Sequence, residues 1–387
     1  MMDSGVFYDK FYEKYGNRNY KPVLFFSPGR VNLIGEHTDY NGGYVFPCAL
    51  NYGTYLLARQ TNNNKLKFST LNFTGDDETE INGLFVNKGK KWINYPLGVI
   101  NEFLKKGIRI GGLEMMYYGD VPNGAGLSSS ASIEMVTAVA LNEFFSAGLT
   151  MIEMVKMSQK AENEFVGMNC GIMDQFAVGF GKKDHAIFLN CNNLTYENVP
   201  LVLGEFSLII TNTNKRRGLT DSKYNERRAE CDKAVELLQA FKPLKNLSEL
   251  NAADIPLLDK YIGDKVVRHR AKHVISENDR VLEAVKVLKE NNLMRFGELM
   301  NKSHDSLRDD YEVTGIELDT LVHEGRKLSG VIGTRMTGAG FGGCTVSIVR
   351  TEESAKFMKD LTEVYKRKTG LVPDFYQPEI GNGAGKL

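Results

Sequence analysis

The chain has 387 residues with 48 basic and 48 acidic side chains, so its formal net charge is zero. A neutral chain has no overall field that would draw it to nucleic acid or to an anionic membrane, so an anionic ligand must be held by local groups. Hydrophobic residues make up 42% and charged residues 25%, a globular composition that argues against intrinsic disorder.

The first half of the chain alternates between expected strands and expected helices. Segments rich in β-branched and aromatic residues predict strands at 23–27, 54–60, 65–70, 112–119, 186–190 and 206–213. Apolar residues at helical spacing predict helices at 132–147 and 151–168.

From about residue 220 the chain is rich in helix. Helices are expected at 222–241, 277–290, 293–307 and 315–328, and a strand at 345–350. This order predicts an α+β protein of two domains. We place an N-terminal domain over 1–200 and a helix-rich C-terminal domain over 201–387.

The cysteines and the start of the chain bear on the compartment. The five cysteines are odd in number and contain no CxxC pair, which argues against a disulfide framework and a zinc site. The first 16 residues lack the apolar segment of a signal peptide, and no apolar run approaches the ~18–20 residues of a membrane span. We expect a cytoplasmic protein that binds neither membrane nor nucleic acid.

A polar segment follows the first expected strand. Residues 27–43, SPGRVNLIGEHTDYNGG, place Arg30, Glu36, His37 and Asp39 within ten residues of one another. A solvated turn is the simple interpretation, but a turn does not need so many functional side chains. Because carboxylates accept hydrogen bonds in the geometry that neighbouring hydroxyls offer, this segment fits a polyol.

A run of glycine and serine, residues 119–132 (GDVPNGAGLSSSAS), opens onto the next expected helix. Free backbone N–H groups and the positive end of a helix make such a segment a phosphate cradle. The alternative is a serine-capped helix after a glycine turn. The segment lacks the GxxxxGK[ST] pattern of P-loop proteins.

The third glycine-bearing segment is TRMTGAGFGGCTVSIV, residues 334–349. Gly338, Gly340 and Gly343 fit GxGxxG, yet the pattern precedes a strand, whereas in a dinucleotide site it follows a strand and opens a helix. We expect a loop at 337–343 that approaches a ligand or another backbone closely.

Three further side chains each have two interpretations. Glu162 lies in the helix expected at 151–168, where a solvated glutamate is commoner than a metal ligand. Asp174 has apolar neighbours, and a carboxylate in such surroundings is either paired or functional. Trp92 fits a core position better than the wall of an adenine site.

Taken in order, the three glycine-bearing segments resemble those of the GHMP kinases, the superfamily of galactokinase, homoserine kinase, mevalonate kinase and phosphomevalonate kinase. GRVNLIGEHTDYNGG resembles the signature of the galactokinase family, and the resemblance extends over nearly the whole chain. It implies a two-domain fold with the active site in the cleft between domains. It also implies transfer of the γ-phosphoryl group of ATP to the anomeric hydroxyl of galactose, which enters galactose metabolism by the Leloir pathway.

The same resemblance implies a role for each motif residue. It places ATP on Gly124, Ala125, Gly126, Leu127, Ser128, Ser129 and Ser130, with Ser69 near the nucleotide. It places Mg²⁺ on Ser130 and Glu162. It assigns sugar contacts to Glu36, His37, Thr38, Asp39 and Tyr224. Asp174 would meet the reacting hydroxyl, with Arg30 beside it.

Phosphoryl transfer has a loose transition state, so catalysis depends mainly on positioning and charge stabilisation. Mg²⁺ keeps several waters, so one hydroxyl and one carboxylate are sufficient protein ligands. We expect Asp174 to accept the proton, while Arg30 orients it and stabilises the transferring charge.

Two alternatives stay open at this level. A kinase of the same superfamily could act on N-acetylgalactosamine, galacturonate, mevalonate or homoserine, although the EHTD run favours a sugar over the last two. A sensor that binds sugar and nucleotide for a regulatory partner is the other alternative. The intact serine run, Glu162, Asp174 and Arg30 favour an enzyme, which we expect to be a monomer or a weak oligomer.

Overall fold

The computed structural model describes residues 4–17, 20–89, 91–121, 126–215 and 220–387. Its N-terminal body is built on a six-stranded sheet with the order β13-β1-β3-β6-β4-β5. These strands are β1 (Val23–Asn32), β3 (Pro47–Thr61), β4 (Lys65–Thr70), β5 (Asp77–Glu80), β6 (Gly112–Gly119) and β13 (Gly385–Lys386). Only the β4–β6 pair is parallel in this described sheet.

The strands predicted at 65–70 and 112–119 are confirmed. The strand predicted at 23–27 is too short, because the ladder with β3 shifts register between Pro28 and Arg30 and then continues to Asn32. This irregularity carries β1 into the polar segment, so Arg30 is placed by a strand rather than by a free loop.

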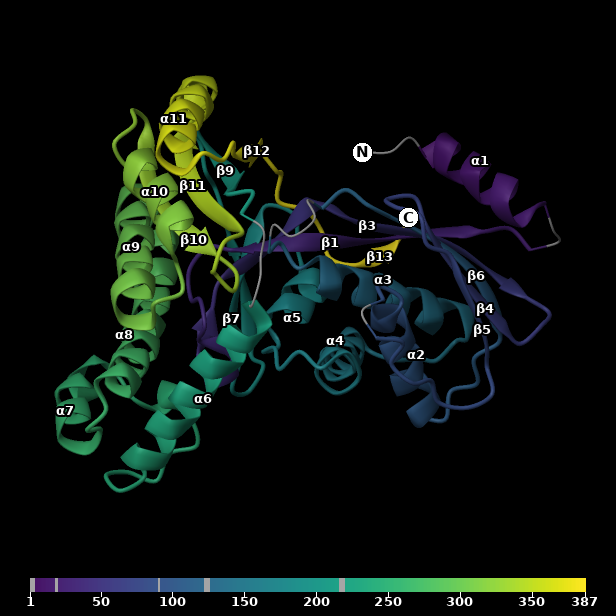
Figure 1. The fold of residues 1–387 in the computed structure, drawn as a ribbon, viewed down its shortest axis with the longest axis horizontal. Coiled ribbons are helices and arrows are strands. Elements are labelled where there is room, and N and C mark those ends of the chain that lie inside the picture. Colours follow the sequence, from purple (N-terminus) through teal and green to yellow (C-terminus); the bar gives the residue numbers. More distant parts are fainter. Residues whose placement is uncertain (1–3, 18–19, 90, 122–125, 216–219) are drawn as a thin grey trace.

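Helices cover both faces of this sheet (Figure 1). One face is covered by α2 (Asn94–Lys105), α3 (Ser129–Phe144), α4 (Met151–Lys160) and α5 (Met173–Phe180). On the other face, α1 (Ser4–Tyr15) packs Phe7 and Phe11 against Leu57 and Met116. Neighbouring Leu56 belongs to the opposite core, as the alternation of side chains along a strand requires.

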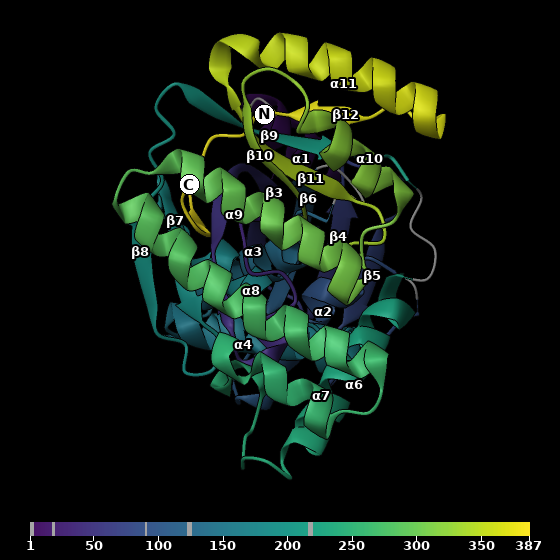
Figure 2. The same cartoon turned by 90° about the vertical axis from the view of Figure 1, so that its left-hand side faces the viewer.

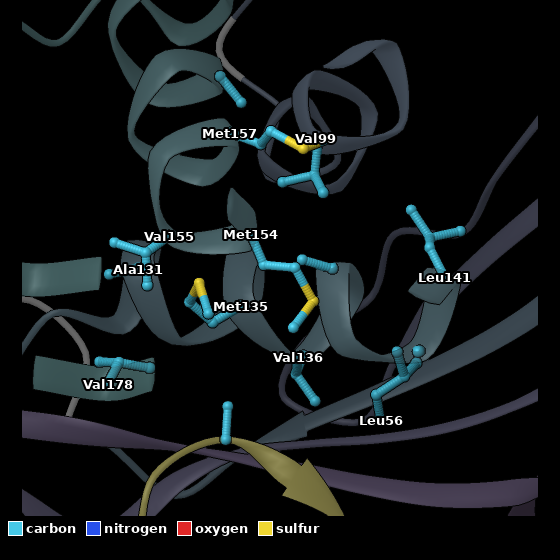
Figure 3. Packing of buried hydrophobic residues seen from close by; sticks show 14 of the residues in the cluster. Leu56, Val99, Ala131, Met135, Val136, Leu141, Met154, Val155, Met157 and Val178 are labelled. Atoms are coloured by element: carbon cyan, nitrogen blue, oxygen red, sulfur yellow. The ribbon is translucent and has the colours of Figure 1, made fainter. Parts of the chain in front are cut away.

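The main core lies between the sheet and α2 to α5. Figure 3 shows Met135 of α3 and Met154 of α4 packed among aliphatic side chains, with Leu56 of the sheet beside them. After α4 the chain continues in a π-helical turn, Ala161–Val166. Such turns alter the direction of side chains and are frequent at functional sites, and this one carries Glu162.

The C-terminal half forms a four-stranded antiparallel sheet with the order β10-β11-β9-β12. Its strands are β9 (Phe206–Asn212), β10 (Val331–Thr337), β11 (Cys344–Arg350) and β12 (Asp374–Tyr376). Its helices are α6 (Thr220–Leu238), α7 (Leu258–Tyr261), α8 (Lys265–Lys289), α9 (Leu293–Ser306), α10 (Ile316–Gly325) and α11 (Ser354–Thr369). Figure 2 shows α8 and α9 lying side by side in front of the β10–β11 hairpin.

The two halves are joined by shared packing. A small sheet of β2 (Tyr44–Val45), β7 (His185–Asn190) and β8 (Tyr196–Pro200) lies between them. One hydrophobic cluster contains Val31 of β1, Val281 of α8 and Val346 of β11. In addition, β13 from the far end of the chain pairs with β1. The division at residue 200 stays a prediction, and these contacts cross it.

Across the described ranges, no helix combines the length and apolarity needed to cross a membrane.

Candidate active site

A cavity of about 210 Å³ lies where β1, the first turn of α3, α5 and the loop after β10 meet. Among the residues predicted for the site, those that line it are Arg30, Glu36, His37, Asp39, Gly126, Ser128, Ser129, Ser130, Glu162, Asp174 and Tyr224. The glycine loop predicted at 337–343 contributes Gly338 and Ala339, and the lining residues that the sequence interpretation missed are Met168, Cys170, Gly171 and Met173. The segments that the motifs singled out therefore converge on one cavity.

Three predicted site residues lie away from this cavity. Ser69 is buried, its hydroxyl accepts from Tyr15 at 2.8 Å, and its expected position near the nucleotide stays a prediction. Thr38 is fully buried with its hydroxyl on the backbone carbonyls of Gly35 and Tyr44, so it supports its own loop, and its sugar contact also stays a prediction. Leu127 is buried in the shared core. Gly124 and Ala125 lie outside the described residues.

Arg30 and Asp174 form the central pair of the cavity. The Arg30 Nε donates to Asp174 Oδ1 at 2.9 Å, and Nη2 lies 2.7 Å from the same oxygen. Nη1 donates to the Gly126 carbonyl at 2.6 Å. One buried guanidinium thus joins the Asp174 carboxylate to the glycine–serine loop, and the pairing expected from the sequence is present.

The N-terminus of α3 faces the cavity through its serines. Ser128 precedes the helix in a left-handed conformation (φ 60°), and its hydroxyl makes no hydrogen bond within the described structure. The first turn of α3 contains no acidic residue. Its free N–H groups and the positive end of the helix dipole are therefore available to an anion such as phosphate.

Glu162 is buried at the edge of the cavity, in contact with the Ser130 hydroxyl. Burial, followed by the charge of Asp174, raises the pKa of Glu162 to about 7. Glu134 lies behind it, and burial together with the Glu162 charge raises the Glu134 pKa well above its usual value. Neighbouring carboxylates repel each other, and a bound cation would relieve this repulsion. Their oxygens are ligands of the kind that Mg²⁺ prefers.

Asp39 is a third carboxylate that lines the cavity. Its carboxylate accepts from the backbone N–H groups of Tyr40 and of Met173 at the start of α5. Burial, and then the charge of Asp174, raises the pKa of Asp39 to about 6. At neutral pH the group is largely ionised, so it can accept hydrogen bonds from hydroxyl groups.

Gly171 makes the position of Asp39 possible. A Cβ atom at Gly171 would lie 1.9 Å from Asp39 Oδ2, so Gly171→Ala must displace that carboxylate. We expect this variant to raise the KM for the hydroxyl-bearing substrate by about tenfold or more while the nucleotide KM stays unchanged. Steady-state kinetics with each substrate varied in turn checks this.

The control for this variant is Gly263→Ala, because Gly263 has no atom within 4 Å of its added Cβ position. A Gly171→Ala protein with the parent's substrate KM would show that the carboxylate position is not decisive.

The raised pKa of Asp39 also predicts a pH-dependent stability difference. The folded protein holds this proton more tightly than the unfolded chain, where the pKa is 3.8, so the group's stabilising contribution is complete at low pH and is lost as the pH rises through about 6. We expect Asp39→Asn to gain ~2 kcal/mol of unfolding free energy relative to the parent between pH 4 and pH 8. Urea denaturation at both pH values checks this, and a pH-independent difference would contradict it.

Glu36 links the polar segment, residues 27–43, to the C-terminal half. Its carboxylate accepts from the backbone N–H of Gly338, from the Asn32 amide and from Thr337 at 3.3 Å, and it pairs with buried Arg335 at 3.4 Å. Burial raises the pKa of Glu36, while Arg335 and Arg30 oppose that shift. Glu36 therefore lines the cavity and also anchors the loop after β10.

His37 is held in a left-handed conformation (φ 63°) by an aromatic cluster. Its Nδ1 lies 2.8 Å from the Tyr40 hydroxyl, which in turn lies 2.7 Å from that of Tyr311. The ring of Tyr224 lies 5.6 Å from the imidazole, centroid to centroid. Burial lowers the pKa of His37 to about 3, so the ring is neutral at physiological pH.

The glycine loop after β10 behaves as predicted. Gly338 lines the cavity, and a Cβ there would lie 2.9 Å from the Gly126 carbonyl. The loop thus approaches both the cavity and another backbone. The loop leads into strand β11 rather than into a helix, so its GxGxxG pattern stands in a different context from that of a dinucleotide fingerprint.

A second cavity of about 170 Å³ adjoins the first and shares Ser129 and Ser130 with it. Trp92, Tyr95 and Phe73 line it. The interpretation of Trp92 as a core residue is therefore wrong in part: its ring packs on Tyr117 at 5.4 Å but also faces this cavity.

Comparisons with known proteins agree with this geometry. Residues 9–60 match the galactokinase galactose-binding signature, 94–182 the GHMP kinases N terminal domain, and 284–367 the GHMP kinases C terminal domain. The galactokinase of Fusobacterium nucleatum is 53% identical over 367 residues, which is 94% of each chain. That of Enterococcus faecalis is 48% identical over 98% of each chain.

Solved structures give the same result. Lactococcus lactis galactokinase complexed with galactose has a TM-score of 0.97 at 44% identity, over 99% of this chain and 100% of that one. Methanococcus jannaschii mevalonate kinase, at 20% identity and a TM-score of 0.67 over 95% of this chain and 100% of that one, shares the fold. The chain belongs to the galactokinase family of the GHMP kinases.

Proposed function

We propose that the main cavity is where this enzyme transfers the γ-phosphoryl group of ATP to the anomeric hydroxyl of D-galactose, giving galactose 1-phosphate. The observation that carries this proposal is the Arg30–Asp174 pair in a cavity that the helix N-terminus after Ser128 and the Asp39 carboxylate also line. Phosphate and sugar would then meet beside the Asp174 carboxylate.

The chemistry assigned to the pair is proton transfer and charge stabilisation. The anomeric O–H bond breaks as its oxygen bonds to the γ-phosphorus, and ADP leaves with the electron pair of the broken P–O bond. Asp174 accepts the proton, while Arg30 keeps its carboxylate in place and stabilises the transferring charge. A loose transition state leaves the hydroxyl lightly bonded, so a late proton transfer to a carboxylate is sufficient.

The sugar side is assigned to Asp39, Glu36, His37 and Tyr224. The Asp39 carboxylate has lone pairs for sugar hydroxyls beyond its two backbone donors. Glu36 is already occupied by protein donors, so its main contribution is to hold the loop against Gly338. The aromatic rings around His37 offer an apolar wall to the sugar ring.

Mg²⁺ is proposed to accompany ATP at Ser130 and Glu162. The donor set fits, because a hydroxyl and a carboxylate are hard oxygen ligands, and burial together with the Asp174 charge raises the Glu162 pKa to about 7, a shift that a cation would oppose. No group of three or more His, Cys, Asp or Glu positioned to hold a metal occurs among the residues that the structure describes. Mg²⁺ does not require one, since waters and phosphate oxygens complete its shell; bound there, it would neutralise phosphate charge.

The second cavity is proposed to hold the adenine ring, because it shares the helix N-terminus with the first and has an aromatic wall. We expect Trp92→Ala to raise the KM for ATP by about tenfold, since stacking of a base on an aromatic ring contributes ~1–3 kcal/mol. The galactose KM should stay within twofold. Trp92→Phe, which keeps a ring, should retain most of the affinity; equal losses in both variants would contradict stacking.

A coupled ATP-consumption assay tests the function directly. We expect turnover with galactose that depends on Mg²⁺, and none with mevalonate or homoserine. N-acetylgalactosamine and galacturonate belong in the same panel, because the sugar loop alone does not separate them from galactose. Nucleotide and sugar binding without phosphate transfer would favour the sensor alternative.

We further propose that the enzyme works in the cytoplasm as a monomer or a weak oligomer, without membrane or nucleic-acid partners. The zero net charge and the five free thiols support this.

A further inference from the structure

Three helical segments that carry the proposed machinery meet at one side chain. Ser130 lies in the first turn of α3, Glu162 lies on the π-helical turn, and Asp174 lies on α5. Gln175, next to Asp174, is completely buried between these segments. Its Nε2 donates to Glu162 Oε2 at 2.6 Å and to Glu134 Oε2, one turn into α3, at 3.0 Å.

We propose that Gln175, supported by Glu134, is a positioning residue that fixes the direction of the Glu162 carboxylate toward the Mg²⁺ bound with ATP. The proposal rests on the cation site assigned above to Ser130 and Glu162. An amide nitrogen has two N–H bonds, and each is directed here at a different carboxylate. Rotation of the amide would therefore break both contacts at once.

The contacts around Glu162 leave little freedom to its carboxylate. Oε2 takes the short bond from Gln175 and lies 3.5 Å from the Cys170 thiol. The Ser130 hydroxyl is hydrogen-bonded to the same carboxylate. Because the partners come from three different segments, the carboxylate direction is set by the packing of α3 against α5 rather than by its own rotamer preference.

Packing alone does not account for this arrangement. Glu134 Oε1 and Gln175 Oε1 are buried and make no hydrogen bond within the described structure. Each such atom lowers stability relative to a satisfied group. Aliphatic side chains of similar volume would fill the space without that cost. Gln175 and Glu134 are therefore polar at a cost in stability, and they lie next to Glu162, the proposed metal ligand. This combination points to a functional role.

The test measures metal-dependent nucleotide binding rather than turnover. Isothermal calorimetry with β,γ-imido-ATP gives the Kd in EDTA and in Mg²⁺, and the ratio is the tightening due to the metal. For Gln175→Leu we expect this ratio to fall at least about tenfold, with the EDTA value and the galactose Kd within twofold of the parent. Glu134→Leu should lower the same ratio by a smaller factor. Glu134→Gln, which keeps an acceptor for the Gln175 amide, should retain most of the ratio.

Thermal unfolding separates positioning from a structural role. Glu134→Leu removes one unsatisfied oxygen but leaves one Gln175 N–H without its acceptor, so the two effects on stability oppose each other. Its Tm should therefore stay close to the parent's while its metal-dependent tightening falls. Ser158→Ala is the matched control. Ser158 is buried one turn before Glu162, and its hydroxyl makes no hydrogen bond with any residue that the structure describes. That variant should keep the parent's ratio.

Two outcomes distinguish this inference from the cation site beneath it. If Glu162→Gln abolishes the tightening but Gln175→Leu and Glu134→Leu keep it, the positioning role is refuted and the cation site stands. If Glu162→Gln itself keeps the parent's tightening, the cation site fails and the inference fails with it. Should Gln175→Leu not fold, the Glu134→Leu and Glu134→Gln pair decides the same question.

Discussion

Replacing Asp174 by Asn is expected to lower kcat by about 10³-fold, within the range contributed by a positioned general base. The amide keeps an oxygen for Arg30, which donates to Asp174 Oδ1 at 2.9 Å, so the geometry of the pair should survive. It cannot accept the proton of the anomeric hydroxyl. Single-turnover kinetics with saturating galactose and ATP measures the chemical step directly.

Galactose binding provides the control for this variant. Its Kd by calorimetry should remain within a few-fold of the parent, because the change is confined to the reacting atom. Asp184→Asn, at an exposed position outside the cavity, should have the parent's kcat. A kcat for Asp174→Asn near the parent's would remove Asp174 from the base role and leave it an electrostatic one.

Asp39→Ala is expected to lower kcat/KM for galactose by ~10³-fold, because sugar hydroxyls would enter a buried site with no acceptor. The backbone donors of Tyr40 and Met173 would lose their partner as well. Affinity for nucleotide should stay within twofold of the parent, since Asp39 lines the first cavity and not the second, aromatic one.

The measurement is a pair of binding isotherms, one for galactose and one for nucleotide, with far-UV circular dichroism as the folding check. Comparable losses of both affinities would indicate a damaged fold rather than a missing contact. Unchanged galactose affinity would show that the sugar is oriented from elsewhere in the cavity.

Much of the site was predictable because its functional side chains lie within short, continuous stretches of sequence. The expected phosphate cradle contains the start of α3 at Ser129, and the polar segment brings Arg30 and Asp39 to the cavity. In each case a short motif combines a backbone turn with the side chains that act. Local sequence is sufficient when the residues that form a site also form its turn.

The supporting residues could not be predicted in the same way. Gln175 and Glu134 belong to no recognisable sequence motif. Their contacts with Glu162 and with each other form only when three separate segments of the chain meet in the fold. Arg335 reaches Glu36 across 299 positions of sequence, which no spacing argument anticipates. Sequence similarity identifies a segment but not the direction of each side chain: Ser69 is buried and bonded to Tyr15, whereas the next residue, Thr70, lines the second cavity.

Helix boundaries failed for physical reasons as well. Helix α2 was missed because Pro96 and Gly98 suggest a loop; Pro96 lies in the first turn, and Gly98 packs tightly on Ala161 and Phe165. Helix α8 begins 12 residues before its predicted start at residue 277, because its first half is rich in charge. There Arg270 is buried and paired with Glu230 at 2.8 Å, a tertiary effect that hydrophobic periodicity does not detect.

The pairing of β13 with β1 has a consequence for biosynthesis. Phe25 and Phe26 on the strand that carries Arg30 are partnered by Lys386 and Gly385, so this flank of the sheet stays open on the ribosome until residue 386 has emerged. An unprotected strand flank is a template for intermolecular pairing. Nascent chains of this protein should therefore depend on holdase chaperones late into translation, and a bulky fusion placed directly after residue 387 should slow maturation more than one placed before residue 4.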